Sequence, residues 1–178
     1  MPNDFTYQVL KDSTEHTVIK VTGFFDGSSG EESNTARIRA NSLYGALDTS
    51  RANLLSSTSN TGSLPYYGLS ISRVWWTSTI PSPGHLNLYW ASDVGPSIMK
   101  LNEGTGVYNE QGNMITISNN SRGQANSNGN IGFYTHGANV NHASYTVIME
   151  LRKDNYDYSR GQERDPAAFN YPPYDITP

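Results

Sequence analysis

Histidine and carboxylate side chains are the first candidates for chemistry in this chain, since both can hold a metal ion or move a proton. Of the four histidines, only His136 and His142 are close in sequence, within the run HGANVNH. A strand-loop-strand arrangement would bring the two imidazoles together. No carboxylate lies beside them to supply the further ligands that a metal site needs. We therefore interpret them as loop and turn histidines, and the sequence predicts no metal site.

Three other patterns resemble catalytic motifs only in part. Glu31 and Glu32 are adjacent carboxylates of the type that glycosidases use, but the surrounding run DGSSGEESN predicts a loop, which holds catalytic groups poorly in place. Gly68–Ser72 resembles a nucleophile elbow, yet Ser72 stands where the second glycine belongs and the flanks predict a strand. Gly104–Gly106 lacks the rest of a dinucleotide motif, and we interpret it as a turn. The sequence predicts no catalytic residue and no cofactor, and we expect a protein that is not an enzyme.

Composition narrows the classes of partner. The chain has 178 residues, a formal net charge of −4 and no cysteine, which excludes disulfides, thiolate metal sites and cysteine nucleophiles. The basic residues are scattered, so the electrostatic footprint of a nucleic-acid-binding protein is missing. The start of the chain has no basic segment followed by an apolar run, and no window approaches 18 consecutive apolar residues. We expect neither a secretory precursor nor a membrane protein, and the predicted partner is a protein or a sugar.

The stretch Ser144–Lys153 is the clearest structural element. Its residues alternate between apolar and polar in the manner of a half-buried strand. The predicted core face consists of Tyr145, Val147, Met149 and Leu151. A strand of this length needs neighbours at both edges and a second apolar layer over its buried face.

Two further stretches predict hairpins. The run Phe5–Phe25 holds two strand-like segments around the polar centre Lys11–Glu15. Leu64–Ser78 and His85–Ala91 flank the breaker sequence PSPG, and we expect them to pair as a second hairpin that carries a heavy aromatic load. In the first strand of that hairpin, one predicted face consists of Leu69, Ile71, Arg73 and Trp75, and the other of Ser70, Ser72, Val74 and Trp76.

The remaining segments also predict strands and loops. Thr35–Leu47 mixes strand and helix spacing, and we favour a strand, while Asp48–Ser63 predicts a long loop. Short strand-like runs follow, separated by turn signals, at Ser97–Asn102, Met114–Ser118 and Asn130–Thr135. Eight or nine strands with no alternating helices predict an antiparallel β-sandwich or jelly roll. We place this single domain at residues 1–153.

Residues 154–178 form a segment of different character, rich in proline and tyrosine and without strand or helix period. Burial of its aromatic rings would roughly offset the conformational entropy lost on ordering the segment. We therefore expect an extended C-terminal arm that becomes ordered on a protein surface, either on its own subunit or on a neighbour. The predicted interface residues of this arm are Tyr156, Tyr158, Phe169, Tyr171 and Tyr174.

The tryptophans of the predicted second hairpin leave two interpretations open. Trp75, Trp76 and Trp90 lie in alternating patterns, so they cannot all face one core. We favour burial between two layers or in an oligomer interface. In the alternative, exposed coplanar rings stack on a carbohydrate.

The chain as a whole resembles a family of phage proteins. The segments that carry the resemblance are FTYQVLKDSTEHTVIKVTGFF, SRVWWTSTIPSPGHLNLYWA and YTVIMELRKDNYDYSRGQERDPAAFNYPPY. In their general character and in their order along the chain, these segments are similar to small structural proteins encoded by marine tailed bacteriophages. This resemblance implies a virion component assembled in the host bacterial cytoplasm, with the major capsid protein or tail subunits as partners. No functional residue is carried over by it.

The expected function is therefore structural. We expect a non-enzymatic capsid decoration or cement protein, with a tail or neck component next, that forms a homo-oligomer and binds neighbours through its sandwich faces and its arm. The alternative is a carbohydrate-binding module of a tail fibre or receptor-binding protein.

Overall fold

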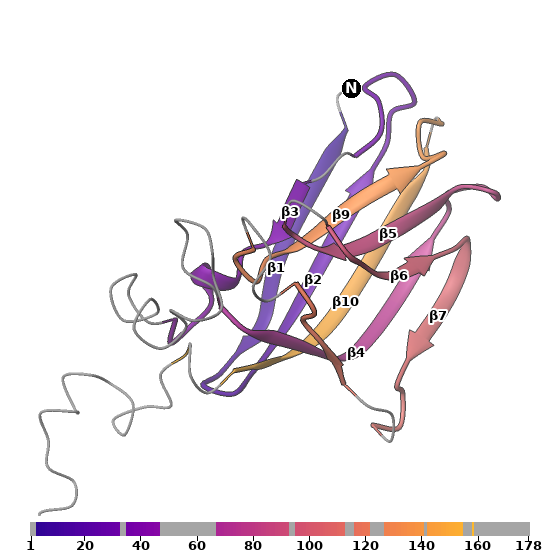
Figure 1. Cartoon of the computed structure of the whole chain (residues 1–178). Coiled ribbons are helices and arrows are strands. Elements are labelled where there is room, and N and C mark those ends of the chain that lie inside the picture. Colours follow the sequence, from indigo (N-terminus) through magenta and orange to yellow (C-terminus); the bar gives the residue numbers. More distant parts are fainter. Residues whose placement is uncertain are drawn as a thin grey trace, which may run out of the picture.

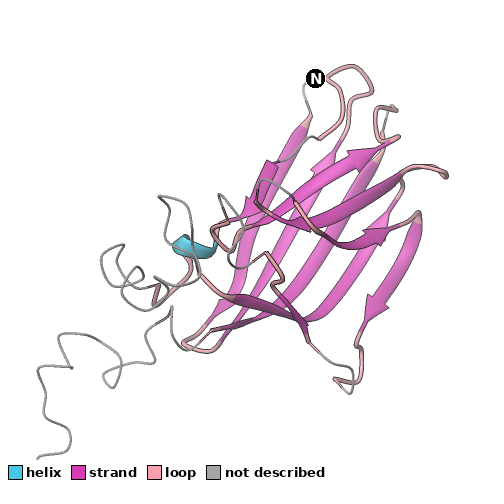
Figure 2. Cartoon of the chain, viewed as in Figure 1, coloured by secondary structure: helices cyan, strands magenta, loops and turns pink. Residues whose placement is uncertain are grey.

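The computed structural model describes residues 3–32, 35–46, 67–92, 95–112, 116–121, 127–140, 142–154 and 158. Two antiparallel sheets pack face to face, and the core fills the space between them (Figure 1). Within the described residues the helical content is a single 3-10 turn at Ala40–Ser42 (Figure 2). This architecture agrees with the predicted antiparallel β-sandwich.

Ten strands make up the sheets. Their bounds are β1 Asp4–Asp12, β2 His16–Phe24, β3 Thr35–Ile38, β4 Leu69–Ser78, β5 His85–Trp90, β6 Ser97–Leu101, β7 Gly104–Tyr108, β8 Ile117–Ser118, β9 Ile131–His136 and β10 Ser144–Lys153. The six-stranded sheet has the order β1-β2-β10-β4-β7, and β8 also pairs with β4. The four-stranded sheet has the order β3-β9-β5-β6. The neighbours β2/β10, β3/β9, β4/β7 and β5/β6 are nested pairs, so the first half of the chain runs antiparallel beside the second half.

Strand β10 occupies the position that its sequence predicts. It pairs with β2 on one side and with β4 on the other, and its bounds match the predicted strand. Its odd-numbered residues from Tyr145 to Leu151 are buried, while the even-numbered residues are partly exposed. The other half of the core comes from the four-stranded sheet, where Leu86, Leu88 and Phe133 are fully buried. The predicted first hairpin is also correct, since β1 and β2 pair antiparallel.

The predicted second hairpin is wrong. Strands β4 and β5 belong to different sheets, because the segment Thr79–Gly84 crosses from one layer to the other. Strand β5 instead pairs with β6 and β9. The breaker sequence PSPG does separate the two strands, but local sequence does not distinguish a hairpin from a crossing between layers.

The predicted faces of β4 hold only for its first residues. The ladder with β10 pairs Ile71 with Leu151 and Arg73 with Glu150, which leaves Ser72 as an extra residue. Such a bulge reverses the alternation beyond it. Val74 is consequently buried and Arg73 is turned outward, the reverse of the prediction. The side-chain amide of Asn109 donates to the Ser72 carbonyl oxygen at 2.7 Å, which satisfies one polar group of the bulge.

Two other segments differ from expectation. The predicted strand at Thr35–Leu47 ends at Ile38, where it gives way to the 3-10 turn. Strand β7 was predicted as a turn because of Gly104 and Gly106. The ring of Trp76 lies across Gly106, where a Cβ atom would overlap it, so this glycine makes room for an aromatic neighbour within a strand. The predicted loop Asp48–Ser63 lies outside the described residues.

Among the described residues there is no helix of the length and apolarity required to cross a membrane.

Candidate functional site

The histidines are not gathered as the sequence pattern suggested. His136 stacks on His85, its cross-strand neighbour, with ring centroids 5.6 Å apart. His142 lies against Phe24 with ring centroids 5.9 Å apart. No group of three or more histidine, aspartate or glutamate side chains within the described ranges could hold a metal ion.

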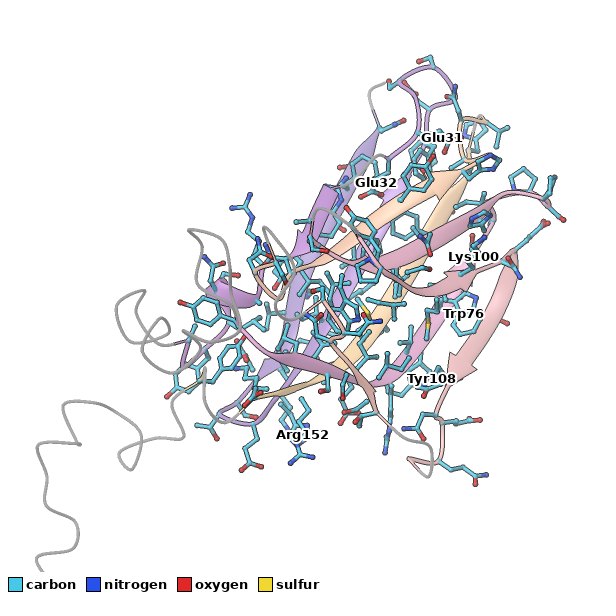
Figure 3. The ribbon with its side chains drawn as sticks, in the orientation of Figure 1. Glu31, Glu32, Trp76, Lys100, Tyr108 and Arg152 are labelled. Carbon is cyan, nitrogen blue, oxygen red and sulfur yellow. The ribbon has the colours of Figure 1, made fainter. Side chains whose placement is uncertain are left out.

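Glu31 and Glu32 hold the loop before β3 onto the sandwich (Figure 3). The carboxylate of Glu31 accepts hydrogen bonds from the backbone N–H groups of Ala138 and Asn139 at 3.1 and 3.3 Å. The backbone of Glu32 continues the edge of the four-stranded sheet, because its carbonyl oxygen accepts from the Thr135 N–H at 2.9 Å. The Glu31 carboxylate therefore binds backbone N–H groups, whereas Glu32 binds β9 through its backbone carbonyl oxygen.

The side chain of Glu32 is 0% exposed and lies inside the end of the sandwich. Its carboxylate accepts a 2.6 Å hydrogen bond from the hydroxyl of Tyr145 and forms an ion pair with Arg37. Burial raises the pKa of Glu32, and the bonds from Tyr145 and Arg37 oppose that rise. Burial also raises the pKa of Tyr145, and the neighbouring Glu32 carboxylate adds to this increase. We call these three residues, Glu32, Arg37 and Tyr145, the Glu32 cluster, and they bind one another at the end of the sandwich.

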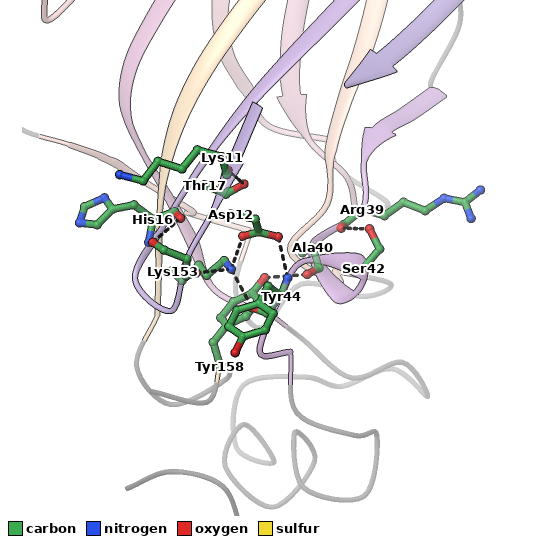
Figure 4. Close-up of polar contacts among 11 residues, drawn as sticks. Lys11, Asp12, His16, Thr17, Arg39, Ala40, Ser42, Tyr44, Lys153 and Tyr158 are labelled. Atoms are coloured by element: carbon green, nitrogen blue, oxygen red, sulfur yellow. Dashed lines mark hydrogen bonds and ion pairs between the residues drawn. The ribbon is translucent and has the colours of Figure 1, made fainter. Parts of the chain in front are cut away.

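A second buried charge lies at the opposite end of β10. The side chain of Lys153 is 0% exposed. Its ammonium group donates to the Asp12 carboxylate at 2.5 Å and to the carbonyl oxygens of Ser13 and Tyr44, each at 2.7 Å (Figure 4). Three acceptors match the three hydrogens of the ammonium group. Burial lowers the pKa of Lys153, and the hydrogen bond and charge of Asp12 oppose this.

Tyr158 joins this group from the predicted arm, and we call Asp12, Tyr44, Lys153 and Tyr158 the Lys153 cluster. Tyr158 is fully buried, and its hydroxyl donates to the Ala40 carbonyl oxygen at 2.8 Å. Its ring lies 5.8 Å from that of Tyr67, and the Lys153 nitrogen lies 5.3 Å from its centroid, within cation–π range. An isolated bridge also pairs its backbone with Ala46. The arm is thus attached to the body of its own chain at residue 158.

The predicted arm contacts therefore have one described member. Tyr158 is buried against its own chain. The others, Tyr156, Phe169, Tyr171 and Tyr174, lie outside the described residues.

The three tryptophans lie on three different surfaces. Trp90 is 1% exposed and belongs to the core, so the folded chain leaves almost none of its ring for a sugar. Trp76 packs against the core at the inner face of the six-stranded sheet, near Tyr108 (Figure 3). Trp75 lies on the outer face of that sheet, between its ladder partners Ile148 and Val107. They form no single coplanar set.

Among the described strands, β1 carries the largest group of exposed apolar side chains that are close together in sequence. Tyr7 and Val9 are each 42% exposed and Leu10 is 48% exposed, and we call these three residues the β1 strip. Tyr7 and Val9 pair with the buried residues Val21 and Ile19, so they lie on the side of the sheet that faces the core. Their exposure shows that this part of β1 has no covering layer among the described residues.

Sequence reasoning missed both charged clusters. One signal was present, because Lys153 continues the odd-numbered, buried row of β10. For Asp12 and Glu32 no local signal exists, since each acquires its buried partner from a strand more than 100 residues away.

No protein-family model matches this chain, and no curated protein sequence is significantly similar to it.

Proposed function

We propose that this chain is a non-enzymatic structural protein of a tailed-phage virion, of the capsid decoration or cement class. The observation that carries the proposal is the nested strand order of the sandwich. From β2 to β10, with the two-residue β8 left aside, eight strands follow the pattern of a chain folded in half and rolled up. This order supports a jelly roll, an architecture that viral capsid domains use.

The exposed features of the molecule suit a role carried out by surfaces. Trp75, Ile148 and Val107 form a cross-strand apolar row on the outer face of the six-stranded sheet. The β1 strip lies at the opposite edge of that sheet, with Tyr7 and Val9 on the side that faces the core. Exposed apolar surface of this kind is typical of contacts with other proteins. In the proposed mechanism, the sandwich presents these surfaces to neighbouring virion subunits, among them the major capsid protein or tail subunits, and the arm secures the contact.

Because Tyr158 is buried, a truncation that tests the arm has to keep this residue. Removing everything after Lys153 would also remove the Tyr158 ring from the body and so disturb the fold. A chain that ends after Tyr158 keeps this anchor. We expect that shorter chain to fold with an unchanged urea midpoint and to lose its binding to phage particles.

The direct test of the virion role is mass spectrometry of purified particles of the phage that encodes the chain, followed by image reconstruction. We expect the chain at a regular, repeated position on the particle. Its absence from purified particles would contradict the proposal.

A second candidate is a carbohydrate-binding module of a tail fibre or receptor-binding protein, because lectin domains also use jelly rolls. The observation in its favour is Trp75, the one of the three tryptophans that lies on an outer face. Specific binding on a glycan array that is lost in Trp75→Ala would favour this candidate. Loss of signal in Trp90→Ala carries no such information, because that residue belongs to the core.

A further inference from the structure

Strand β1 is the longest edge strand in the described part of the chain. It has nine residues, and Asp4 to Val9 pair with β2 in unbroken register before a shift between Val9 and Lys11. Edge strands are usually shortened, interrupted or charged, because their free N–H and C=O groups invite pairing with another chain. The remaining edge strands are shorter, since β3 has four residues, β6 and β7 have five each, and β8 has two.

The two ends of the inner face of β1 are covered, and the middle is open. At one end the Arg37 guanidinium lies 3.9 Å above the Phe5 ring, which packs edge-on against Phe25. At the other end Asp12 is held by Lys153 and by the backbone N–H of Tyr44 at 2.7 Å. Tyr7 and Val9 between them have no such cover. The strip is therefore an apolar site with a defined length and polar contacts at both ends.

The position of Tyr158 points to the occupant. This residue is fixed in the Lys153 cluster, and Asp12 of the same cluster is the last residue of β1. Tyr158, the last described residue, therefore lies near the Asp12 end of the β1 strip. Residues 159–178 can span up to about 65 Å when extended, whereas a nine-residue strand is about 30 Å long. That length is enough to reach the same strip on an adjacent copy.

The chemistry of this segment also fits the strip. Residues 165–178 contain Phe169, Tyr171 and Tyr174, together with prolines at 166, 172, 173 and 178. Prolines prevent a long hydrogen-bonded ladder, so the segment is poorly suited to add a strand to the sheet. Extended proline-rich segments bind instead by placing side chains on apolar and aromatic surfaces, with little entropy lost on binding.

We propose that the β1 strip of one copy receives residues 159–178 of a neighbouring copy. The inference rests on the proposed function, in which the arm secures contacts between subunits, and it adds the surface that the arm binds. The strip is exposed in the described part of the chain, and residues 159–178 are long enough to reach the strip of an adjacent copy. Each copy then gives one arm and accepts another.

The test uses light scattering of the full-length chain over a range of concentrations. Tyr7→Thr/Val9→Thr keeps the strand propensity of β1 and removes the apolar surface. Val140→Thr is the matched control, because Val140 is 40% exposed and lies in the loop between β9 and β10. We expect the wild-type chain and Val140→Thr to associate equally, and the double variant to associate at least about tenfold more weakly. The chain ending after Tyr158 should be monomeric.

A synthetic peptide of residues 159–178 gives the second measurement. Fluorescence anisotropy should show binding to the chain that ends after Tyr158, with affinity about tenfold lower for the same chain carrying Tyr7→Thr/Val9→Thr and unchanged for Val140→Thr. Failure of the peptide to bind overturns the proposal. A full-length chain that stays monomeric while the peptide binds shows that each strip takes its own arm, which also overturns it. If the chain ending after Tyr158 associates as strongly as the full-length chain, β1 pairs with β1 of a second copy and the arm is not the occupant.

These outcomes are separate from the virion role. The peptide and light-scattering measurements use the isolated protein, so they stand whether or not mass spectrometry finds the chain in particles. A chain that is present in particles but whose peptide does not bind would retain the proposed function and lose this inference.

Discussion

The two ends of β10 offer a direct comparison, because each places a charged group inside the sandwich. At the first end, Tyr145 binds the carboxylate of Glu32. At the last residue, Lys153 binds the carboxylate of Asp12. Both ionisable groups are removed from water, and both have hydrogen-bonding partners, as a buried charge requires.

The clusters differ in what they connect. The Glu32 cluster joins the loop before β3 to the two sheets and stays within the body of the domain. The Lys153 cluster joins the end of β1, the segment after the 3-10 turn and Tyr158 from the arm. The Glu32 cluster thus connects the two sheets at the Tyr145 end of β10. The Lys153 cluster, at the other end, also holds Tyr158 of the arm. Substitutions at the two ends should separate stability from arm attachment.

The largest effect is expected for Lys153→Met. This change leaves the Asp12 carboxylate and two carbonyl oxygens without the ammonium group that they share. Removing one partner of a buried ion pair typically costs about 3–5 kcal/mol of unfolding free energy. Arg152→Met is the control, because Arg152 is exposed on the opposite face of β10 (Figure 3). Urea unfolding should show a change within about 0.5 kcal/mol for the control, and equal effects of the two substitutions would contradict the assigned role of Lys153.

Tyr158→Ala should have the next largest effect. It removes a fully buried ring and the hydrogen bond to the Ala40 carbonyl oxygen, with an expected cost of about 3 kcal/mol. Tyr134→Ala is a suitable comparison, because Tyr134 is 37% exposed. If urea unfolding gives the same small change for both tyrosines, Tyr158 does not anchor the arm in solution.

At the opposite end, Tyr145→Phe should cost about 1–3 kcal/mol. It keeps the buried ring and removes only the hydroxyl, so one oxygen of the buried Glu32 carboxylate loses its donor. The assembly of the full-length chain should be unchanged, because this cluster does not touch the arm. Weakened assembly, measured by light scattering under conditions where the variant is folded, would contradict the proposal that only the Lys153 end of β10 is connected to the arm.

The central part of this fold could be predicted from the sequence because its signals are local. The alternation from Tyr145 to Leu151 predicts the buried face of β10, and the same period places Lys153 inside. The reversal in β4 could not be predicted in this way. The extra residue Ser72 has no distinctive side chain, and its carbonyl oxygen is satisfied by Asn109, which lies 37 residues further along the chain.

Pairing between distant segments accounts for the other failures. Gly104 and Gly106 are turn residues by composition, and only the ring of Trp76 explains a glycine inside strand β7. The β1 strip could not be predicted from the sequence either, because Tyr7 and Val9 have the spacing of core residues. Their exposure depends on which segments pack over β1, and no part of the β1 sequence encodes this.

The pH dependence of stability tests the Glu32 cluster with the smallest expected effect. Burial raises the pKa of Glu32 above its ordinary value of 4.5, so the folded chain retains a proton that the unfolded chain releases. The unfolding free energy contributed by this group is present below pH 4.5 and is lost as the pH rises through the folded pKa, with a slope of at most about 1.4 kcal/mol per pH unit. Glu32→Gln removes this titration, so the stability of wild type relative to Glu32→Gln should fall between pH 4 and pH 7 in urea unfolding. A relative stability that rises over the same interval would mean that the bonds from Arg37 and Tyr145 outweigh burial, and that folding lowers the pKa of Glu32.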